Sequence, residues 1–114
     1  MKLPCPPNAC PMDSITDLLS GPWTTYIVWV LHEHNEMRFG ALKRQVSGVS
    51  TRMLTARLRH LEAFGLVHRH VEPTSPPQVT YSLTDRGTEL AVTLRGLNEL
   101  ARRWQSEDVR IAAE

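Results

Sequence analysis

The stretch STRMLTARLRHLEAFG, residues 50–65, decides which fold the rest of the chain can adopt. Ser50 is a residue type that favours a helix N-cap, and Gly65 is one that favours a helix C-terminus. Between them the leucines follow an i, i+4, i+7 pattern, which is typical of a helix with one buried face. The stretch therefore predicts an amphipathic helix whose buried residues are Leu54, Leu58 and Leu61.

The opposite face of this helix carries two guanidinium groups, one hydroxyl and one small side chain: those of Arg52, Thr55, Ala56 and Arg59. An Arg can form a bidentate pair with a guanine edge, and a Thr can bond a base or touch the methyl group of thymine. A face that only meets solvent would more often carry Glu–Lys pairs, and this helix has no acidic residue before Glu62. We therefore favour a helix that reads the major groove of DNA over a solvated face.

The segments around this helix complete a helix-turn-helix with a wing. A short helix ending at residues 47–48 is expected before it, because apolar residues recur there at helical spacing: Phe39, Leu42 and Val46. After Gly65 the period changes to two, which predicts strands over residues 66–71 and 78–83, joined by a Pro-rich loop. The second strand is expected to bury one face, which carries Val79, Tyr81 and Leu83. Two short helices followed at once by a hairpin form a winged helix-turn-helix.

The chain before this unit is expected to form two helices and a very short strand. Asp13 or Ser14 can cap a short helix that ends at residues 21–22. A second helix over about residues 24–34 is apolar on nearly all faces, so we expect it to be the central buried helix. Residues 37–39 can form the short strand. The predicted fold class is therefore mainly α with a small β-hairpin.

A last helix is expected after the hairpin, capped by Thr84 and about 20 residues long. Its apolar stripe comprises Leu90, Leu94, Leu97, Ala101 and Trp104. The stripe can pack on its own domain or pair with a second chain, and a long seam beside a small domain favours a homodimer. We predict an extended arm over residues 1–11, a winged helix-turn-helix domain with its dimerisation helices over 12–105, and a C-terminal tail over 106–114.

Charge is unevenly distributed along the chain, although the formal net charge is only +1. Residues 38–71 carry seven Lys and Arg side chains and one acidic residue, whereas residues 1–37 carry one and four, and residues 72–114 carry five and seven. A basic centre between acidic flanks is expected of a surface that binds a polyanion, but charge alone equally allows a solvated basic face. Two recognition helices in a dimer would suit a pseudo-palindromic site on double-stranded DNA.

Phosphate contacts are expected around the start of the reading helix. Ser50 and Thr51 lie at its N-terminal end, where free N–H groups favour an anion, and Lys43 and Arg44 lie on the preceding helix. On the hairpin, Arg69 can reach phosphate or the minor groove, although the tip of the loop carries no cation. The full set of expected DNA contacts is Arg38, Lys43, Arg44, Ser50, Thr51, Arg52, Thr55, Arg59 and Arg69.

Two other groups of side chains near the reading helix admit several interpretations. Arg57 lies nearer its buried flank, where DNA contact, an ion pair with Glu62 and packing along apolar surface all stay open. Three histidines, at positions 60, 68 and 70, follow no metal-ligand spacing and have no thiol or carboxylate beside them. We therefore expect no metal site, and no cofactor.

Cys5 and Cys10 both lie in the Pro-rich arm. Cys10 immediately precedes the first expected helix, whose N-terminus would lower the pKa of the thiol and favour the reactive thiolate. A sensor that is oxidised or alkylated and an inert, partly buried thiol both stay open at this point.

Enzymes and membrane proteins are disfavoured by what the sequence lacks. The two cysteines do not have Cys-x-x-Cys spacing, which argues against a thiol-redox enzyme. The N-terminus has no apolar segment typical of a signal peptide, and no apolar stretch is long enough to cross a bilayer. A cytoplasmic protein that is not an enzyme is therefore expected.

With these residues in view, the chain resembles the HxlR-type regulators, a winged-helix family related to the MarR group, over roughly residues 10–100. One departure is Pro22, because a basic residue often precedes the Trp in that family, so a phosphate contact from there is in doubt. The matching motifs are Cys10-Pro11, Gly21 with Trp23, Arg38-Phe39 with Leu42, Gly48-Val49-Ser50, Met53-Leu54-Thr55, Leu58-Arg59, Leu61-Glu62, Gly65-Leu66-Val67, Arg69, Pro76-Pro77, Val79, Tyr81-Ser82-Leu83-Thr84 and Gly87.

The resemblance implies a homodimeric transcription factor, either a repressor or an activator, with the first and last helices at the dimer interface. Ile15 and Leu18 would then join the apolar stripe in that interface. In many such proteins the cysteine that matches Cys10 senses electrophiles or oxidation. The alternative of another class is a winged helix that binds a protein and not DNA, and the basic residues Arg52 and Arg59 argue against it.

Overall fold

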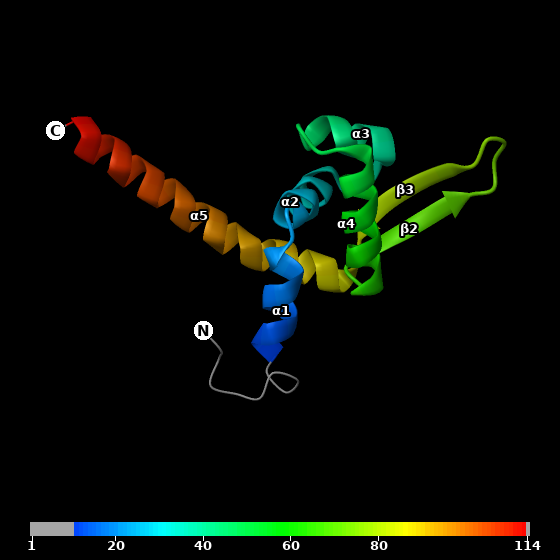
Figure 1. Ribbon diagram of the computed structural model, residues 1–114, viewed down its shortest axis with the longest axis horizontal. Coiled ribbons are helices and arrows are strands. Elements are labelled where there is room, and N and C mark those ends of the chain that lie inside the picture. The colour runs from blue at the N-terminus through cyan, green and yellow to red at the C-terminus, as the bar shows by residue number, and fades with distance from the viewer. Residues whose placement is uncertain (1–10, 114) are drawn as a thin grey trace.

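The computed structural model describes residues 11–113, which form a mainly helical domain with a small antiparallel sheet (Figure 1). The predicted fold class, a winged helix-turn-helix, is confirmed. Among these residues no helix is both long enough and apolar enough to span a bilayer. In chain order the elements are α1 (Pro11–Ser20), α2 (Thr24–His34), β1 (Glu36–Arg38), α3 (Phe39–Gln45), α4 (Thr51–Ala63), β2 (Val67–Glu72), β3 (Gln78–Leu83) and α5 (Asp85–Ala113).

The helix predicted over residues 50–65 is α4. The Ser50 hydroxyl accepts a hydrogen bond from the Met53 N–H (3.1 Å), which satisfies one of the donors that a helix start leaves free. Gly65 has a φ of 75°, a left-handed conformation that costs little only for glycine, and it follows the end of the helix. The inward face is buried and comprises Leu54, Leu58 and Leu61. Each such side chain contributes on the order of 2 kcal/mol, so together they fix the rotation of α4 about its axis.

The sheet has the order β1-β3-β2, with antiparallel pairing throughout. Tyr81 in the central strand pairs with Met37 of β1 on one side and with Arg69 of β2 on the other. The predicted alternation of buried and exposed residues in β3 is wrong, because all six of its residues are half-buried. Both neighbours cover the edges of this strand, and its hairpin with β2 extends away from the helices (Figure 1).

The helix α2 is central, as predicted, but the prediction that it is buried holds only for part of its surface. It packs against α1, α3, α5 and the sheet, and Ile27, Val28 and Leu31 are fully buried between these elements. On its other side Tyr26 is 64% exposed. The apolar sequence of α2 therefore overstates its burial.

The two terminal helices differ in extent from the prediction. α1 already includes Pro11, so the helix starts before the predicted caps at Asp13 or Ser14. The cap of α5 is confirmed, because the Thr84 hydroxyl accepts a hydrogen bond from the Gly87 N–H (3.1 Å). This helix then continues for 29 residues, so residues 106–113 are its last turns and not a separate tail. Figure 1 shows this end projecting far from the body.

Candidate nucleic-acid interface

The face of α4 opposite its buried leucines is open to solvent. Arg52, Ala56 and Arg59 are exposed, as their spacing predicted, and Thr55 is half-buried. The Thr55 hydroxyl donates to the Thr51 carbonyl oxygen (2.8 Å), so its proton is engaged within the helix. Its methyl group and oxygen lone pairs stay available, which suits contact with a thymine methyl or a base donor.

A cleft of about 450 Å³ lies between this face and the wing, which is the hairpin of β2 and β3. Arg59 and Glu62 line it from α4, Arg69 lines it from β2, and Tyr81 lines it from β3. Two guanidinium groups and a phenol from three elements thus share one polar cleft beside the reading face. Such a set can bind phosphate oxygens and base acceptors, and Glu62 can orient the cations or accept from a cytosine amine.

Glu62 and Tyr81 were not predicted as site residues. In the sequence Tyr81 shares a strand face with Val79 and Leu83, so its pattern predicts a core position and gives no sign of a role in the cleft. The half-buried state of Tyr81 explains both observations, because its ring packs against the core while the side chain also lines the cleft.

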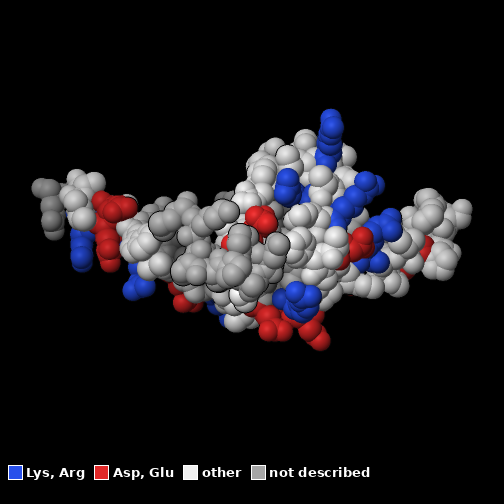
Figure 2. Space-filling model, turned by 60° about the horizontal axis from the view of Figure 1, so that its bottom comes forward, with Lys and Arg blue, Asp and Glu red and all other residues white. Residues whose placement is uncertain are grey.

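The predicted phosphate contacts cluster at the start of α4 and on α3. Ser50, Thr51, Lys43 and Arg44 are all exposed. Figure 2 shows Lys and Arg side chains on the upper part of the body and near the base of the hairpin, with few acidic side chains among them. The positive end of α4 lies on this basic side, which favours an anion there.

Arg38 belongs to the base of the wing. It ends β1, pairs with Thr80 in the sheet, and donates from Nη2 to the Gln78 Oε1 atom (2.6 Å). Gln78 opens β3, so this hydrogen bond ties the hairpin to the strand that precedes α3. The Arg38 side chain remains exposed, and its other N–H groups can still reach a phosphate.

Two histidines of the wing and one arginine of α4 are the remaining polar side chains near the cleft whose roles the sequence left open. His68 and His70 are exposed, with ring centroids 6.2 Å apart, and both flank Arg69. Within residues 11–113, no group of three or more His, Cys, Asp or Glu side chains could hold a metal ion. Arg57 does not lie in the cleft, and its guanidinium group packs against Gly21 in the turn between α1 and α2.

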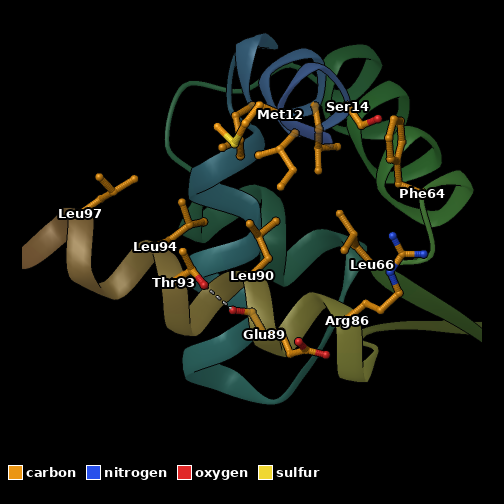
Figure 3. Close-up of a pocket in the computed structure, with 13 residues that line it drawn as sticks. Met12, Ser14, Phe64, Leu66, Arg86, Glu89, Leu90, Thr93, Leu94 and Leu97 are labelled. Carbon is orange, nitrogen blue, oxygen red and sulfur yellow. Dashed lines mark hydrogen bonds between the residues drawn. The ribbon is translucent and has the colours of Figure 1, made fainter. Parts of the chain in front are cut away.

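A second, apolar groove lies between α1 and α5. It measures about 550 Å³, and the close-up shows side chains of both helices facing it (Figure 3). Of the residues predicted at a dimer interface, this groove brings together Ile15, Leu18, Leu90, Leu94 and Leu97.

The residues predicted at the dimer interface differ in how exposed they are within the single chain. Leu18 and Leu94 are already buried within the single chain, whereas Leu97 is 57% exposed and Trp104 is 58% exposed. Ala101 is also exposed and lies with Trp104 further along α5, outside the groove. The first half of the stripe therefore packs on its own domain, and its second half is left uncovered within the single chain. Cys10, the predicted sensor, lies outside the described residues.

Comparison with known proteins agrees with this architecture. A model of the family described as HxlR-like helix-turn-helix matches residues 18–109. The uncharacterized HTH-type transcriptional regulator sll1512 of Synechocystis is 37% identical over 101 residues, which cover 89% of this chain and 74% of that protein.

Solved structures with the same fold include two described by their redox states. The reduced form of the transcriptional regulator YodB from B. subtilis has a TM-score of 0.71 and 33% identity, over 81% of this chain and 90% of that chain. The redox regulator HypR in its oxidized form has a TM-score of 0.74 and 34% identity, over 82% and 96%. YodB is also known in diamide-treated and quinone-bound forms. Because the family model matches most of the sequence and the fold agrees, this chain belongs to the HxlR-like helix-turn-helix family of transcriptional regulators.

Proposed function

We propose that this protein is a homodimeric regulator that binds a specific, pseudo-palindromic site on duplex DNA. The observation that carries the proposal is the polar cleft between α4 and the wing, where Arg59 and Arg69 meet beside an exposed reading face. Membership of a family of transcriptional regulators supports the same function.

In this proposal some of the polar side chains around α4 bind base edges and others bind phosphates. Arg52, Thr55 and Arg59 read base edges in the major groove, because they project from the exposed side of a helix that fits that groove. The contacts to the DNA phosphates come from residues at the start of α4 and on the elements around it: Arg38, Lys43, Arg44, Ser50, Thr51 and Arg69.

Dimerisation would cover the apolar surface that one chain leaves open. Leu97 and Trp104 are large, apolar and more than half exposed on a helix that projects from the body (Figure 1). Ala101 between them would let a second helix approach closely. A second copy that packs along α5 and the groove beside α1, which holds Ile15 and Leu18, would bury this surface and place two copies of α4 on one duplex.

Cys10 is proposed to control DNA binding through oxidation or alkylation of its thiol. In the sequence it directly precedes Pro11, which lies in α1, and a helix N-terminus stabilises a thiolate. The similarity to YodB and HypR, which are known in diamide-treated and oxidized forms, supports this role. Substitution of Cys10 by Ser should therefore remove any effect of diamide on DNA binding and leave binding by the reduced protein unchanged.

The decisive experiment is a fluorescence-anisotropy titration of the reduced protein with the DNA upstream of its own gene, beside a scrambled duplex, at several salt concentrations. A preference of about 10³ or more for the upstream DNA, with a steep salt dependence, is expected of a specific regulator. The titration is repeated with diamide-treated wild type and Cys10→Ser.

Two outcomes would contradict parts of the proposal. Equal and weak binding to both duplexes, and to a random-sequence pool after selection, would indicate a winged helix that serves a protein partner. A diamide effect that persists in Cys10→Ser would contradict the proposed sensor role while leaving DNA binding intact.

A further inference from the structure

Arg57 lies on α4, but its side chain does not line the cleft between α4 and the wing. Its guanidinium group crosses to the turn between α1 and α2, where it packs against Gly21. A Cβ atom at Gly21 would overlap Arg57 Nη1 and lie 3.0 Å from its Cζ atom. Only a residue without a side chain therefore leaves room for the cation at this turn.

The same turn begins α2, and the start of this helix has unsatisfied donors. The first backbone hydrogen bond of α2 joins the Ile27 N–H to the Trp23 carbonyl oxygen (3.0 Å), and no side chain caps the helix at Trp23. The N–H groups of Thr24, Thr25 and Tyr26 therefore have no partner within the helix, and they carry the positive end of its dipole. A guanidinium group and a helix N-terminus thus meet at one point.

Two buried polar atoms at this point also lack partners. Thr24 is only 1% exposed, yet its hydroxyl oxygen makes no hydrogen bond among the described residues, and neither does the buried Nε atom of Arg57. The Thr24 oxygen lies 3.3 Å from the position of a Cβ atom at Gly21, so it faces the same spot as the guanidinium group. Buried polar atoms without partners are uncommon, and two of them beside one turn point to an acceptor that binds there.

The location of this spot identifies the acceptor. The Trp23 ring lies 3.4 Å from the position of a Cβ atom at Gly48, so the start of α2 adjoins the turn that leads into α4. A duplex that contacts the start of α4 would lie close to this turn, and a duplex presents phosphate oxygens along its edge.

We propose that Arg57 and the N-terminus of α2 together bind one backbone phosphate of the DNA beside α4. The terminal guanidinium nitrogens and the free N–H groups of residues 24–26 would donate to its oxygens. A water between the phosphate and the Thr24 hydroxyl would satisfy the buried atoms behind it. This inference rests on the proposed DNA-binding function and adds to it a contact that the reading face and the wing do not supply.

The test is the salt dependence of DNA binding for variants at this turn, measured against the specific and the scrambled duplex. Arg57→Gln should lower the slope of log K against log salt by about 0.9 for each protomer bound, equally for both duplexes, because the contact is to phosphate. Arg57→Lys should keep most of the slope. Gly21→Ala retains the charge but displaces the guanidinium group, so it should lower the slope as well.

Two controls separate this effect from general changes of charge or helix stability. Arg110→Gln removes a charge from the last turn of α5, and Gly96→Ala adds a methyl group where nothing lies within 4 Å. Both should leave the slope unchanged. Thermal unfolding of each variant shows whether it is folded, and if Arg57→Gln is not, Gly21→Ala carries the test.

An unchanged slope in folded Arg57→Gln or Gly21→Ala, with wild-type binding intact, would overturn the phosphate site and leave the proposed function standing. Loss of affinity for the specific duplex alone would also overturn it, because that result assigns Arg57 to base recognition. Wild-type protein that binds neither duplex would contradict the proposed function itself, and this inference with it.

Discussion

Arg59 and Lys43 illustrate how a cation on the basic side of the molecule can affect DNA binding in two ways. Arg59 projects from the exposed face of α4 into the cleft beside the wing, whereas Lys43 lies on α3. A side chain that bonds a base edge adds affinity only for the correct sequence, and one that bonds a phosphate adds affinity for any duplex. The two residues therefore make different predictions.

Substitution of Arg59 by Ala should weaken binding to the specific duplex by about 1–3 kcal/mol, roughly 5- to 150-fold, and should lower the preference over a scrambled duplex. Substitution of Lys43 by Ala should weaken binding to both duplexes alike. Anisotropy titrations with the two duplexes measure both effects. If Arg59→Ala lowers affinity for both duplexes equally, Arg59 contacts phosphate and does not read a base.

Ser50 combines a structural and a functional role that two substitutions can separate. Ser50→Ala removes the acceptor for the Met53 N–H and should cost about 1 kcal/mol of unfolding free energy, measured by urea denaturation. Ser50→Asp keeps a capping oxygen, so stability should be retained, but it places a negative charge where a phosphate is expected and should lower DNA affinity. If Ser50→Asp binds DNA as the wild type does, the start of α4 does not face a phosphate.

At the scale of whole elements, α5 is unusual because a helix of 29 residues leaves its second half without a partner in the single chain. Few contacts with other elements stabilise this second half, so the intrinsic helix propensity of its residues matters more here than in the buried elements. Two glycines in α5 lie in opposite environments. Gly96 has nothing within 4 Å of an added Cβ atom, whereas a Cβ atom at Gly87 would overlap the Leu66 carbonyl oxygen.

These environments predict opposite changes in stability for the same substitution. Gly96→Ala should raise the unfolding free energy by about 1 kcal/mol, because alanine has a higher helix propensity than glycine at a solvent-exposed position away from the helix ends. Gly87→Ala should lower it, because the backbone of α5 would have to move away from the segment that follows α4. Urea denaturation of both variants under identical conditions provides the comparison. A loss of stability in Gly96→Ala would show that α5 is not a continuous helix at this point.

The wing depends on contacts that join elements far apart in the chain. Arg38 at the end of β1 holds Gln78 at the base of the hairpin, and Tyr81 pairs with strands on both sides. The wing is thus anchored at its base to the segment that enters α3. This anchoring keeps Arg69 in the cleft opposite Arg59.

At the scale of the whole molecule, the exposed half of α5 gives a single chain an elongated shape, with extents of 59 × 42 × 25 Å. Leu97 and Trp104 would remain in water unless a second chain covers them. Apolar side chains of this size that gather on one projecting helix favour association.

Leu97→Asp should therefore convert the proposed dimer to a folded monomer and lower DNA affinity, because one recognition helix binds more weakly than two. The side chain is 57% exposed, so folding of the single chain should survive the change. Sedimentation velocity measures the mass, and circular dichroism measures the helix content. Val92→Asp is the matched control, because Val92 is 52% exposed on a different face of α5. A dimer that persists in Leu97→Asp, or is lost in Val92→Asp, would contradict the proposed interface.

The sequence alone determined the features that depend on neighbours a few residues apart. The leucine spacing of α4, the caps at Ser50 and Thr84, the stop at Gly65 and the bounds of β3 were all predicted, because helices, caps and strand ends follow from local periodicity and hydrogen bonding. The exposure of Arg52, Ala56 and Arg59 followed from the same reasoning, since the side chains opposite a buried stripe face away from the core.

Only the tertiary structure decided where long side chains end and which apolar residues stay uncovered. Arg57 reaches Gly21, which is far from it in sequence, and Arg59, Arg69 and Tyr81 meet in one cleft only after three elements have packed. The stripe of α5 is uniform in sequence, yet Leu94 is buried and Leu97 is exposed, because the other elements cover Leu94 and leave most of Leu97 uncovered. Local patterns specify which face of an element is apolar, but packing between distant segments determines how much of that face is covered and which charged groups become neighbours.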